Sequence, residues 1–336
     1  RTQELLISAV ISASYCYYIS SKIQSRRVLR LVSLLPVCSL FLVLPLSFSS
    51  VHLCVFTTFS LSWLANSKLI LFAFDQGPLH PLPQNLLSFF CLCCLPIKPR
   101  QHPSPDGSPP LLPKPRRSIV LAIKFVTFSV LLNVYEHKNR LPWILVSGLH
   151  AMLIYLDLEL GLLFVGSVVS TLLGCEIEPL FNEPYLATSL QDFWSRRWNL
   201  MVPATLRTTV HGPVNRATAR LVGHDRGPFL GIVASFLVSG LMHELIFYYL
   251  TRTLPTWEVT WFFVLHGVCT AAEMAVKRRA TWRVHKEISW LLAMGFTVVT
   301  GGWLFFPQLV RSHVLERFTS EALLCIDFVT RKLLFI

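Results

Sequence analysis

The sequence predicts an all-α protein whose helices cross a membrane many times, and its composition and charge distribution support this fold class. Of the 336 residues, 53% are hydrophobic and only 14% are charged, and the mean hydropathy is +0.55. This apolar content exceeds what the core of a soluble protein requires and is typical of a multi-pass membrane protein. The 30 Lys and Arg residues outnumber the 18 Asp and Glu residues and fall between the apolar runs. Their placement favours cytosolic loops over a surface that binds nucleic acid.

Apolar runs divide the chain into about eight predicted membrane crossings. In chain order these runs are residues 5–19, 31–46, 51–74, 118–135, 142–174, 228–250, 258–275 and 288–306. The run 142–174 is too long for one straight span. Counting it as one tilted or broken crossing places every strongly basic loop on the cytosolic side of the membrane. A further stretch, 321–336, predicts a membrane-associated helix near the end of the chain.

Three connecting segments complete this plan, and we expect residues 1–336 to form one integral-membrane domain. The sequence Asp75-Gln-Gly-Pro78 predicts a turn at the membrane surface. Residues 85–95 are apolar but short, which predicts an interfacial or re-entrant piece. Residues 96–117 are rich in Pro and Ser and contain five Lys and Arg residues. This composition predicts a flexible, basic loop on the cytosolic side.

The run 228–250 contains two adjacent ionisable residues near its middle, His243 and Glu244. A titratable side chain at that depth is costly, so it marks a candidate functional site. On a helix, Ser239 shares the face of His243, whereas Glu244 points about 100° away and is not placed to orient the imidazole. The alternative is a histidine that is hydrogen-bonded between packed helices, and this run alone does not separate the two interpretations.

A second polar constellation precedes that helix in the chain. Ser189 followed by Asp192 is typical of a capping box, which predicts that a helix begins there. On such a helix Asp192 and Arg196 are spaced to form an i,i+4 ion pair. Trp194 and Trp198 form an aromatic stripe beside them. An amphipathic helix at the membrane interface explains this pattern, because Trp and Arg both favour the headgroup region.

The same constellation also suits ligand binding, because adjacent guanidinium groups at Arg196 and Arg197 can bind a phosphate-bearing molecule such as coenzyme A. Metal chemistry is not predicted. His243-Glu244 lacks the second histidine of a His-Glu-x-x-His zinc site. The cluster Cys91-Leu-Cys93-Cys94 has no matching Cys or His pair at zinc-site spacing, and we expect it to have a packing role.

These stretches together resemble a known family. Ser189-Leu-Gln-Asp-Phe-Trp-Ser-Arg-Arg-Trp-Asn199 and Ser239-Gly-Leu-Met-His-Glu244, with Asn199 and His243 separated by 44 residues, resemble motifs of the plant wax synthases. That family consists of long-chain-alcohol O-fatty-acyltransferases in the membrane-bound O-acyltransferase superfamily. Phe74-Asp-Gln-Gly-Pro-Leu79 and Trp303-Leu-Phe-Phe-Pro307 also resemble family segments. The resemblance is densest over residues 179–267, which we interpret as the catalytic core.

The resemblance implies a membrane-bound O-acyltransferase fold with a substrate tunnel inside the membrane. It implies transfer of a fatty acyl group from acyl-CoA to a long-chain fatty alcohol, in the endoplasmic reticulum membrane, with a wax ester as product. His243 maps onto the catalytic histidine, a general base, and Asn199 onto the second motif residue. We expect acyl-CoA as co-substrate, with no cofactor and no metal. The residues expected to bind substrate are Asp192, Trp194, Arg196, Arg197, Trp198, Ser239 and Glu244.

The same residues are also compatible with three other functional interpretations. Acyl transfer to a sterol would use the same base, and the sequence does not separate the two acceptors. A proton-coupled transporter would use His243, Glu244 and Glu273 as a relay, but such transporters show paired repeats that are not seen here. That function would also leave the Asn199 motif unexplained. An inactive family member is a third alternative, and the oligomeric state and acyl chain length do not follow from the sequence.

Overall fold

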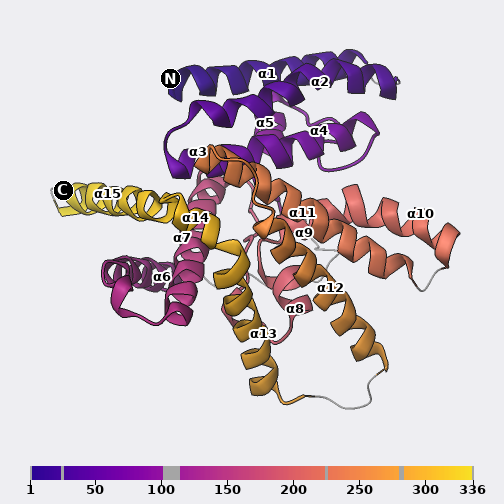
Figure 1. Cartoon of the computed structure of the whole chain (residues 1–336). Coiled ribbons are helices and arrows are strands. Elements are labelled where there is room, and N and C mark those ends of the chain that lie inside the picture. The colour runs from indigo at the N-terminus through magenta and orange to yellow at the C-terminus, as the bar shows by residue number, and fades with distance from the viewer. Residues whose placement is uncertain (1, 24–25, 101–113, 224–225, 280–283, 335–336) are drawn as a thin grey trace. The chain divides into compact units, whose positions relative to one another are not determined.

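The computed structural model describes residues 2–23, 26–100, 114–223, 226–279 and 284–334 (Figure 1). Within these residues the regular structure is helical, apart from one isolated bridge between Pro99 and Ile177. Seven helices of this part of the chain are long and apolar enough to cross a membrane, namely Arg27–Ser47, Val51–Ala73, Ser118–Tyr135, Trp143–Leu173, Gly227–Thr251, Glu258–Arg279 and Lys286–Phe305. The prediction of an all-α, multi-pass membrane protein is confirmed.

The seven spanning helices coincide with seven of the predicted runs. The first predicted run, 5–19, lies in α1 (Thr2–Lys22), which is not among the seven. The long run 142–174 forms the single helix α7 (Trp143–Leu173), whose 31 residues extend about 46 Å. Because the hydrocarbon core is about 30 Å thick, α7 can cross once with a tilt. One crossing at α7 is what the distribution of basic loops requires.

Contacts between residues divide the chain into two compact units, which are described separately. The first unit comprises Arg1–Lys98, Asn199–Pro255 and Phe263–Ala272, and the second comprises Pro99–Trp198, Thr256–Phe262 and Glu273–Ile336. The predicted flexible loop 96–117 falls largely outside the described residues, which end at 100 and resume at 114. Just before that gap, the Arg100 N–H donates to the carbonyl of Glu176 (2.8 Å).

The first unit contains most of the N-terminal half of the fold and the helix that carries His243. Its helices are α1, α2 (Arg27–Val43), α3 (Val51–Thr57), α4 (Asn66–Ala73), α5 (Leu86–Cys94), α9 (Met201–Leu206), α10 (Gly212–Val222), α11 (Gly227–Thr251) and the middle of α12 (Glu258–Arg279). The π-helical segment η2 (Thr58–Ala65) joins α3 to α4, and a second, η6 (Arg207–His211), joins α9 to α10. Helices α1, α2, α4 and α5 lie together in Figure 1 and share one apolar core.

The short apolar stretch 85–95 forms the helix α5, which is held by a buried lysine. Asn85 caps its first turn, since the Asn85 side chain accepts from the Ser88 N–H (2.8 Å). At the other end, Lys68 Nζ donates to the carbonyls of Leu92 (2.7 Å) and Leu95 (2.9 Å). These carbonyls have no intrahelical partner, so the ammonium satisfies the helix end in an apolar setting. The side chains of Cys91, Cys93 and Cys94 are all buried, as packing residues are.

A second cationic anchor joins α2 to the predicted turn at Asp75. The Arg30 side chain is only 3% exposed, and its guanidinium bonds the Asp75 carboxylate and the carbonyl of Ala73 (3.0 Å). Arg27 binds the other Asp75 oxygen at 2.8 Å. Hydrogen bonds from Arg30 and then Arg27 lower the pKa of the Asp75 carboxyl. The turn itself is confirmed, since the Gln76 N–H returns to the Leu71 carbonyl (2.9 Å).

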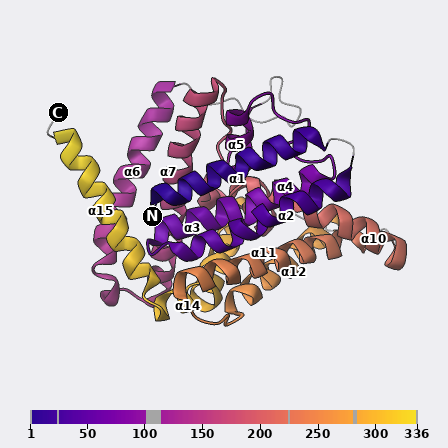
Figure 2. The same cartoon turned by 90° about the horizontal axis from the view of Figure 1, so that it is seen from above.

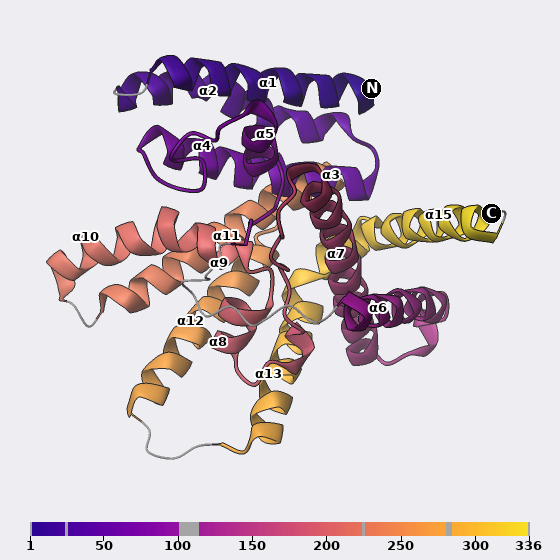
Figure 3. The same cartoon turned by 180° about the vertical axis from the view of Figure 1, so that it is seen from behind.

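The second unit contains the α6–α7 pair and the C-terminal helices. Its helices are α6 (Lys114–Tyr135), α7, α8 (Leu190–Asp192), α13 (Lys286–Thr300), α14 (Pro307–Arg311) and α15 (Val314–Leu334), with the π-helical segments η5 (Phe193–Arg197) and η7 (Gly301–Phe305). Helix α6 lies beside α7 and α15 (Figures 2 and 3). A close approach between α7 and η7 depends on Gly302, because a Cβ there would collide with Ser147.

The pair α6–α7 contains an ion pair inside the predicted spans. Lys124 Nζ lies 2.6 Å from Glu159 Oε1, and the two side chains are 14% and 7% exposed. Both residues occupy membrane-spanning segments, where an isolated charge is strongly disfavoured. Each residue therefore requires the other, which explains the lysine inside an otherwise apolar run.

We predict that removing one partner of this pair destabilises the protein more than removing both. Lys124→Met or Glu159→Leu leaves a buried, unpaired charge and should cost about 3–5 kcal/mol of unfolding free energy. The double variant leaves no charge and should unfold much closer to wild type. Thermal or denaturant unfolding of the detergent-solubilised protein measures this difference.

The control is the i,i+4 pair Asp327–Arg331, whose side chains are 53% and 72% exposed. Neutralising that pair should change stability by less than about 1 kcal/mol. If the two single losses at Lys124 and Glu159 simply add in the double variant, the ion pair does not stabilise the hairpin.

Candidate active site

The side chain of His243 is oriented by its own helix. Its Nδ1 lies 2.7 Å from the carbonyl oxygen of Ser239, one turn earlier in α11. A carbonyl can only accept, so Nδ1 carries the proton and Nε2 presents a lone pair. This is the tautomer that a general base needs. The predicted association of Ser239 with His243 is present, and it uses the Ser239 main chain.

His243 lies deep in its helix. It follows Gly227, the first residue of α11, by 16 residues, which corresponds to about 24 Å along the helix axis. The opposite end at Thr251 is about 12 Å away. The next residue, Glu244, is buried and points about 100° around the helix from the imidazole. His243 therefore lies within the apolar part of the span, nearer its C-terminal end.

An aromatic residue of α12 covers the imidazole. The ring centroids of His243 and Phe263 are 4.3 Å apart with planes inclined by 34°. This close contact depends on a glycine, because a Cβ at Gly267 would lie 2.7 Å from the Cβ of Phe236 in α11. Sequence reasoning missed Phe263, since no local pattern predicts which residue of the following helix faces His243. One turn on, His266 is fully buried.

Asn199 occupies an unusual backbone position in the same unit. Its φ angle is 38°, in the left-handed region that Asn tolerates better than most other side chains. The residue is 7% exposed, and its Oδ1 has no hydrogen-bond partner in the part of the chain that the structure describes. A buried amide oxygen without a partner is unfavourable, so this atom is available to a ligand. Its main-chain carbonyl accepts from the Val202 N–H (2.9 Å) at the start of α9.

The predicted helix begins at Ser189 in the second unit, but its cap is not a reciprocal capping box, because the return bond goes to the residue before Ser189. The Ser189 hydroxyl accepts from the Asp192 N–H (3.0 Å), and the Asp192 carboxylate accepts from the Thr188 N–H (3.3 Å). Glu273 adds a further bond that the sequence did not predict, since its carboxylate accepts from the Leu190 N–H (2.8 Å). The negative charge of Glu273 lies at the N-terminal end of the helical segment, where it is stabilising. Lys277 balances that charge at 2.6 Å.

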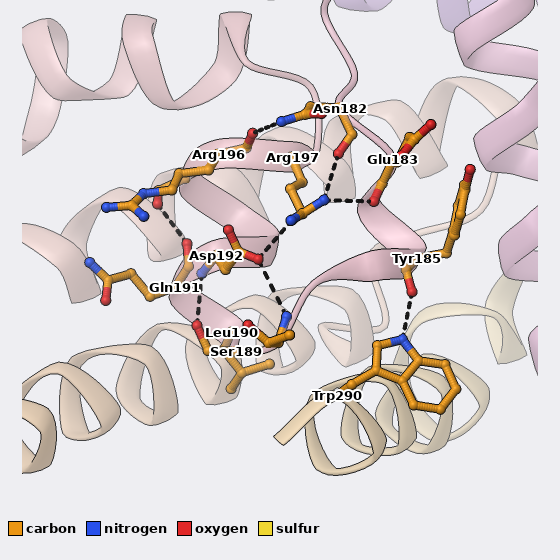
Figure 4. A network of polar contacts seen from close by, with 12 residues as sticks. Asn182, Glu183, Tyr185, Ser189, Leu190, Gln191, Asp192, Arg196, Arg197 and Trp290 are labelled. Atoms are coloured by element: carbon orange, nitrogen blue, oxygen red, sulfur yellow. Dashed lines mark hydrogen bonds and ion pairs between the residues drawn. The ribbon is translucent and has the colours of Figure 1, made fainter. Parts of the chain in front are cut away.

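The predicted ion pair between Asp192 and Arg196 is wrong, and Arg197 takes that place. Arg197 Nε lies 2.7 Å from Asp192, and its Nη1 donates to the carbonyls of Asn182 (3.2 Å) and Glu183 (3.3 Å), as Figure 4 shows. The cause is the π-helical turn η5, whose i→i+5 bonding brings residues five apart onto one face. An α-helical spacing rule cannot anticipate this shift.

Arg196 consequently points away from this network in Figure 4. Its side chain is exposed, and within the described residues its guanidinium has no hydrogen bond or ion pair. Of the two arginines predicted to bind phosphate, Arg196 is free to do so, whereas Arg197 already holds the segment together.

The two tryptophans of the segment pack inward. Trp198 stacks on Phe193 with centroids 5.5 Å apart and planes inclined by 18°, and it meets Phe181 edge-on at 5.4 Å. The ring centroids of Trp194 and Phe262 lie 6.3 Å apart. The segment is therefore anchored by ring packing beneath the Asp192–Arg197 pair. A further tryptophan, Trp290, donates to the carbonyl of Tyr185 (2.8 Å) and ties the preceding loop to α13.

We predict different consequences for the two neighbouring arginines. Arg197→Gln removes a charged hydrogen-bond donor from Asp192 and two carbonyls, so it should cost about 1.5–3 kcal/mol of unfolding free energy. Arg196→Gln, the matched control, should leave stability within about 0.5 kcal/mol of wild type. Unfolding of the purified variants in detergent measures both values. Equal losses for the two variants would contradict the assignment of Arg197 as the structural arginine.

Comparison with known proteins places these motifs in a family. A family model described as the membrane bound O-acyl transferase family matches residues 177–265. A protein of Arabidopsis thaliana named probable long-chain-alcohol O-fatty-acyltransferase 1 is 59% identical over 96% of this chain and 95% of its own length. Two others, named probable long-chain-alcohol O-fatty-acyltransferases 3 and 2, are each 55% identical, over 98% and 97% of this chain and 96% and 94% of their own lengths. The chain therefore belongs to the membrane-bound O-acyltransferase family, within the group that contains the long-chain-alcohol O-fatty-acyltransferases.

Proposed function

We propose that this protein transfers a fatty acyl group from acyl-CoA to the hydroxyl of a long-chain fatty alcohol, forming a wax ester and free CoA. The observation that supports proton transfer to His243 is the hydrogen bond between His243 Nδ1 and the Ser239 carbonyl. It leaves Nε2 as a fixed proton acceptor inside an apolar helix. The similarity to the Arabidopsis proteins named as long-chain-alcohol O-fatty-acyltransferases supports the substrate class.

In this mechanism His243 Nε2 takes the proton from the alcohol hydroxyl. The alcohol oxygen attacks the carbonyl carbon of the thioester, and the carbon–sulfur bond breaks. CoA leaves as the thiolate, which recovers the proton from the imidazolium. The reaction forms no acyl-enzyme and uses neither metal nor cofactor. A tunnel within the membrane would hold both long chains and align their reactive ends, which supplies most of the entropic advantage.

Asn199 is proposed to bind the thioester region of acyl-CoA. The Ser239 carbonyl already orients His243, so the asparagine is not needed for that purpose. Its buried Oδ1 lacks a partner among the described residues and can accept a hydrogen bond from an amide N–H of the CoA arm next to the thioester. A fixed amide dipole also stabilises charge that develops on the thioester oxygen, provided that its Nδ2 faces that oxygen.

Arg196 is proposed to bind a phosphate of the nucleotide part of acyl-CoA, because its exposed guanidinium lacks an acidic partner among the described residues. Arg197 and Asp192 would shape this site indirectly by holding the segment, with Trp194 and Trp198 packed beneath it. We place the enzyme in the endoplasmic reticulum membrane, where acyl-CoA is supplied on the cytosolic side.

We predict that His243→Ala abolishes acyl transfer without removing the protein from membranes. Loss of a general base typically lowers turnover about 10²–10⁴-fold. The assay is product formation in microsomes from a host without wax synthesis, with labelled acyl-CoA offered separately to a fatty alcohol, a sterol and diacylglycerol. His285→Ala is the control, because His285 is exposed and makes no side-chain cap bond at the start of α13.

The acceptor panel separates the alternatives. Wax ester from wild type and His285→Ala but not from His243→Ala supports both the reaction and the base. Sterol ester alone would retain the mechanism and replace the acceptor. Near-wild-type activity in His243→Ala would exclude this mechanism. No product with any acceptor, from protein that is folded and inserted, would favour an inactive family member or a transporter.

A further prediction separates the backbone role of Asn199 from its side-chain role. Glycine adopts a φ angle of 38° without strain, so Asn199→Gly should keep the fold while it removes the amide. We expect turnover to fall about 10²-fold with little change in unfolding temperature. Asn199→Ala should lose activity and also about 1–2 kcal/mol of stability, because its Cβ disfavours that conformation. Wild-type turnover in Asn199→Gly would show that the residue acts only through the backbone.

A further inference from the structure

The helix α10 is held against the first turns of α11. The chain reverses between them, so that His211 lies beside Gly231 and Asn215 beside Gly227. A Cβ at Gly231 would lie 2.9 Å from the His211 ring, and a Cβ at Gly227 would collide with the Asn215 side chain. Two glycines one turn apart therefore permit this close hairpin. Gly227 begins a helix that is long and apolar enough to cross a membrane, so α10 packs beside the end of a candidate span.

The face of α10 that points away from α11 carries both cationic and apolar side chains. Arg216 and Arg220 lie one turn apart on it and are exposed, and neither forms an ion pair with any described residue. Leu221 on the same side is 82% exposed. Pro213 and Ala217 are the other exposed residues of this face. An exposed leucine beside two exposed arginines is typical of a helix at a lipid–water interface.

The sequence around this face carries an excess of positive charge. Arg207 and Arg226, which flank the helix, are also exposed. From Asn199 to Arg226 the sequence contains four arginines and a single acidic residue, Asp225. The segment also falls among the basic regions that the positive-inside pattern assigns to the cytosolic leaflet, which carries anionic lipids.

We propose that the exposed face of α10 is a binding surface for the headgroups of anionic phospholipids. Guanidinium groups bind phosphate oxygens through paired hydrogen bonds. Leu221 and Ala217 would contact the acyl and glycerol region beside the bound headgroup. The nucleotide phosphates of a soluble ligand fit this face less well, because it is the convex side of a helix and includes an almost fully exposed leucine. The residues of this surface do not include His243, Asn199 or Arg196.

The test uses native mass spectrometry of the full chain in neutral detergent, with phosphatidylserine and phosphatidylcholine as probes. We expect wild type to bind phosphatidylserine more tightly than phosphatidylcholine. Arg216→Gln/Arg220→Gln should weaken phosphatidylserine binding about 30-fold, which corresponds to about fivefold for each arginine near an anionic surface. Binding of phosphatidylcholine should not change. Salt near 1 M, where the Debye length is about 3 Å, should reduce the preference in wild type.

The matched control is Lys22→Gln/Arg26→Gln, which removes the same charge from two exposed residues elsewhere in the first unit. It should retain the preference for phosphatidylserine, and both double variants should show wild-type unfolding temperatures. If the control variant lost as much phosphatidylserine binding, the effect would depend only on net charge, and the proposal would be overturned. Displacement of phosphatidylserine by free CoA, or no preference in wild type, would also overturn it. Acyl transfer by Arg216→Gln/Arg220→Gln in neutral lipid should be unchanged, so this outcome is independent of the proposed reaction.

Discussion

A polar group in an apolar medium is costly unless it finds a partner within the protein, and the buried cations and His243 of this fold meet that requirement. Lys68 binds the carbonyls at the end of α5, Arg30 binds a carboxylate and a carbonyl, and Lys124 binds Glu159. His243 obeys the same rule, since its Nδ1–H bonds the Ser239 carbonyl. In the first three cases the bond serves stability. For His243 it also fixes which ring nitrogen of the neutral imidazole carries the proton.

The chain winds as π-helix instead of α-helix in several segments, and in two of them the change places a side chain against a specific partner. Four π-helical segments lie within the described residues: η2, η5, η6 and η7. In η2 the altered winding accompanies buried hydroxyls, and Ser62 donates to the carbonyl of Phe41 (2.7 Å) across to α2. In η5 it brings Asp192 to Arg197 and turns Arg196 outward. Such segments are frequent at functional sites because they shift the register of every side chain that follows.

The cationic residues of the chain fall into two classes with different physical roles. Arg30, Lys68, Lys124 and Arg197 are largely buried and bound to carboxylates or carbonyls, and their loss would leave an unpaired group inside the structure. Arg196, Arg216 and Arg220 are exposed and lack such partners among the described residues. The positively charged residues of the chain therefore do not form one functional surface. Part of it stabilises helix contacts, and part is available to phosphate groups.

The sequence alone determined the fold class, the seven spanning segments and the helix start at Ser189, because hydrophobic length and cap chemistry are local properties. It also singled out His243, since an ionisable residue in an apolar run is visible without a structure. Tertiary structure decided which residues meet. The contact of Phe263 with the imidazole, the Lys124–Glu159 pair and the α10–α11 hairpin depend on packing between segments distant in the chain or on glycines that allow close approach. Asp192 pairs with Arg197 instead of Arg196 because of a π-helical turn, which the period of an α-helix does not reveal.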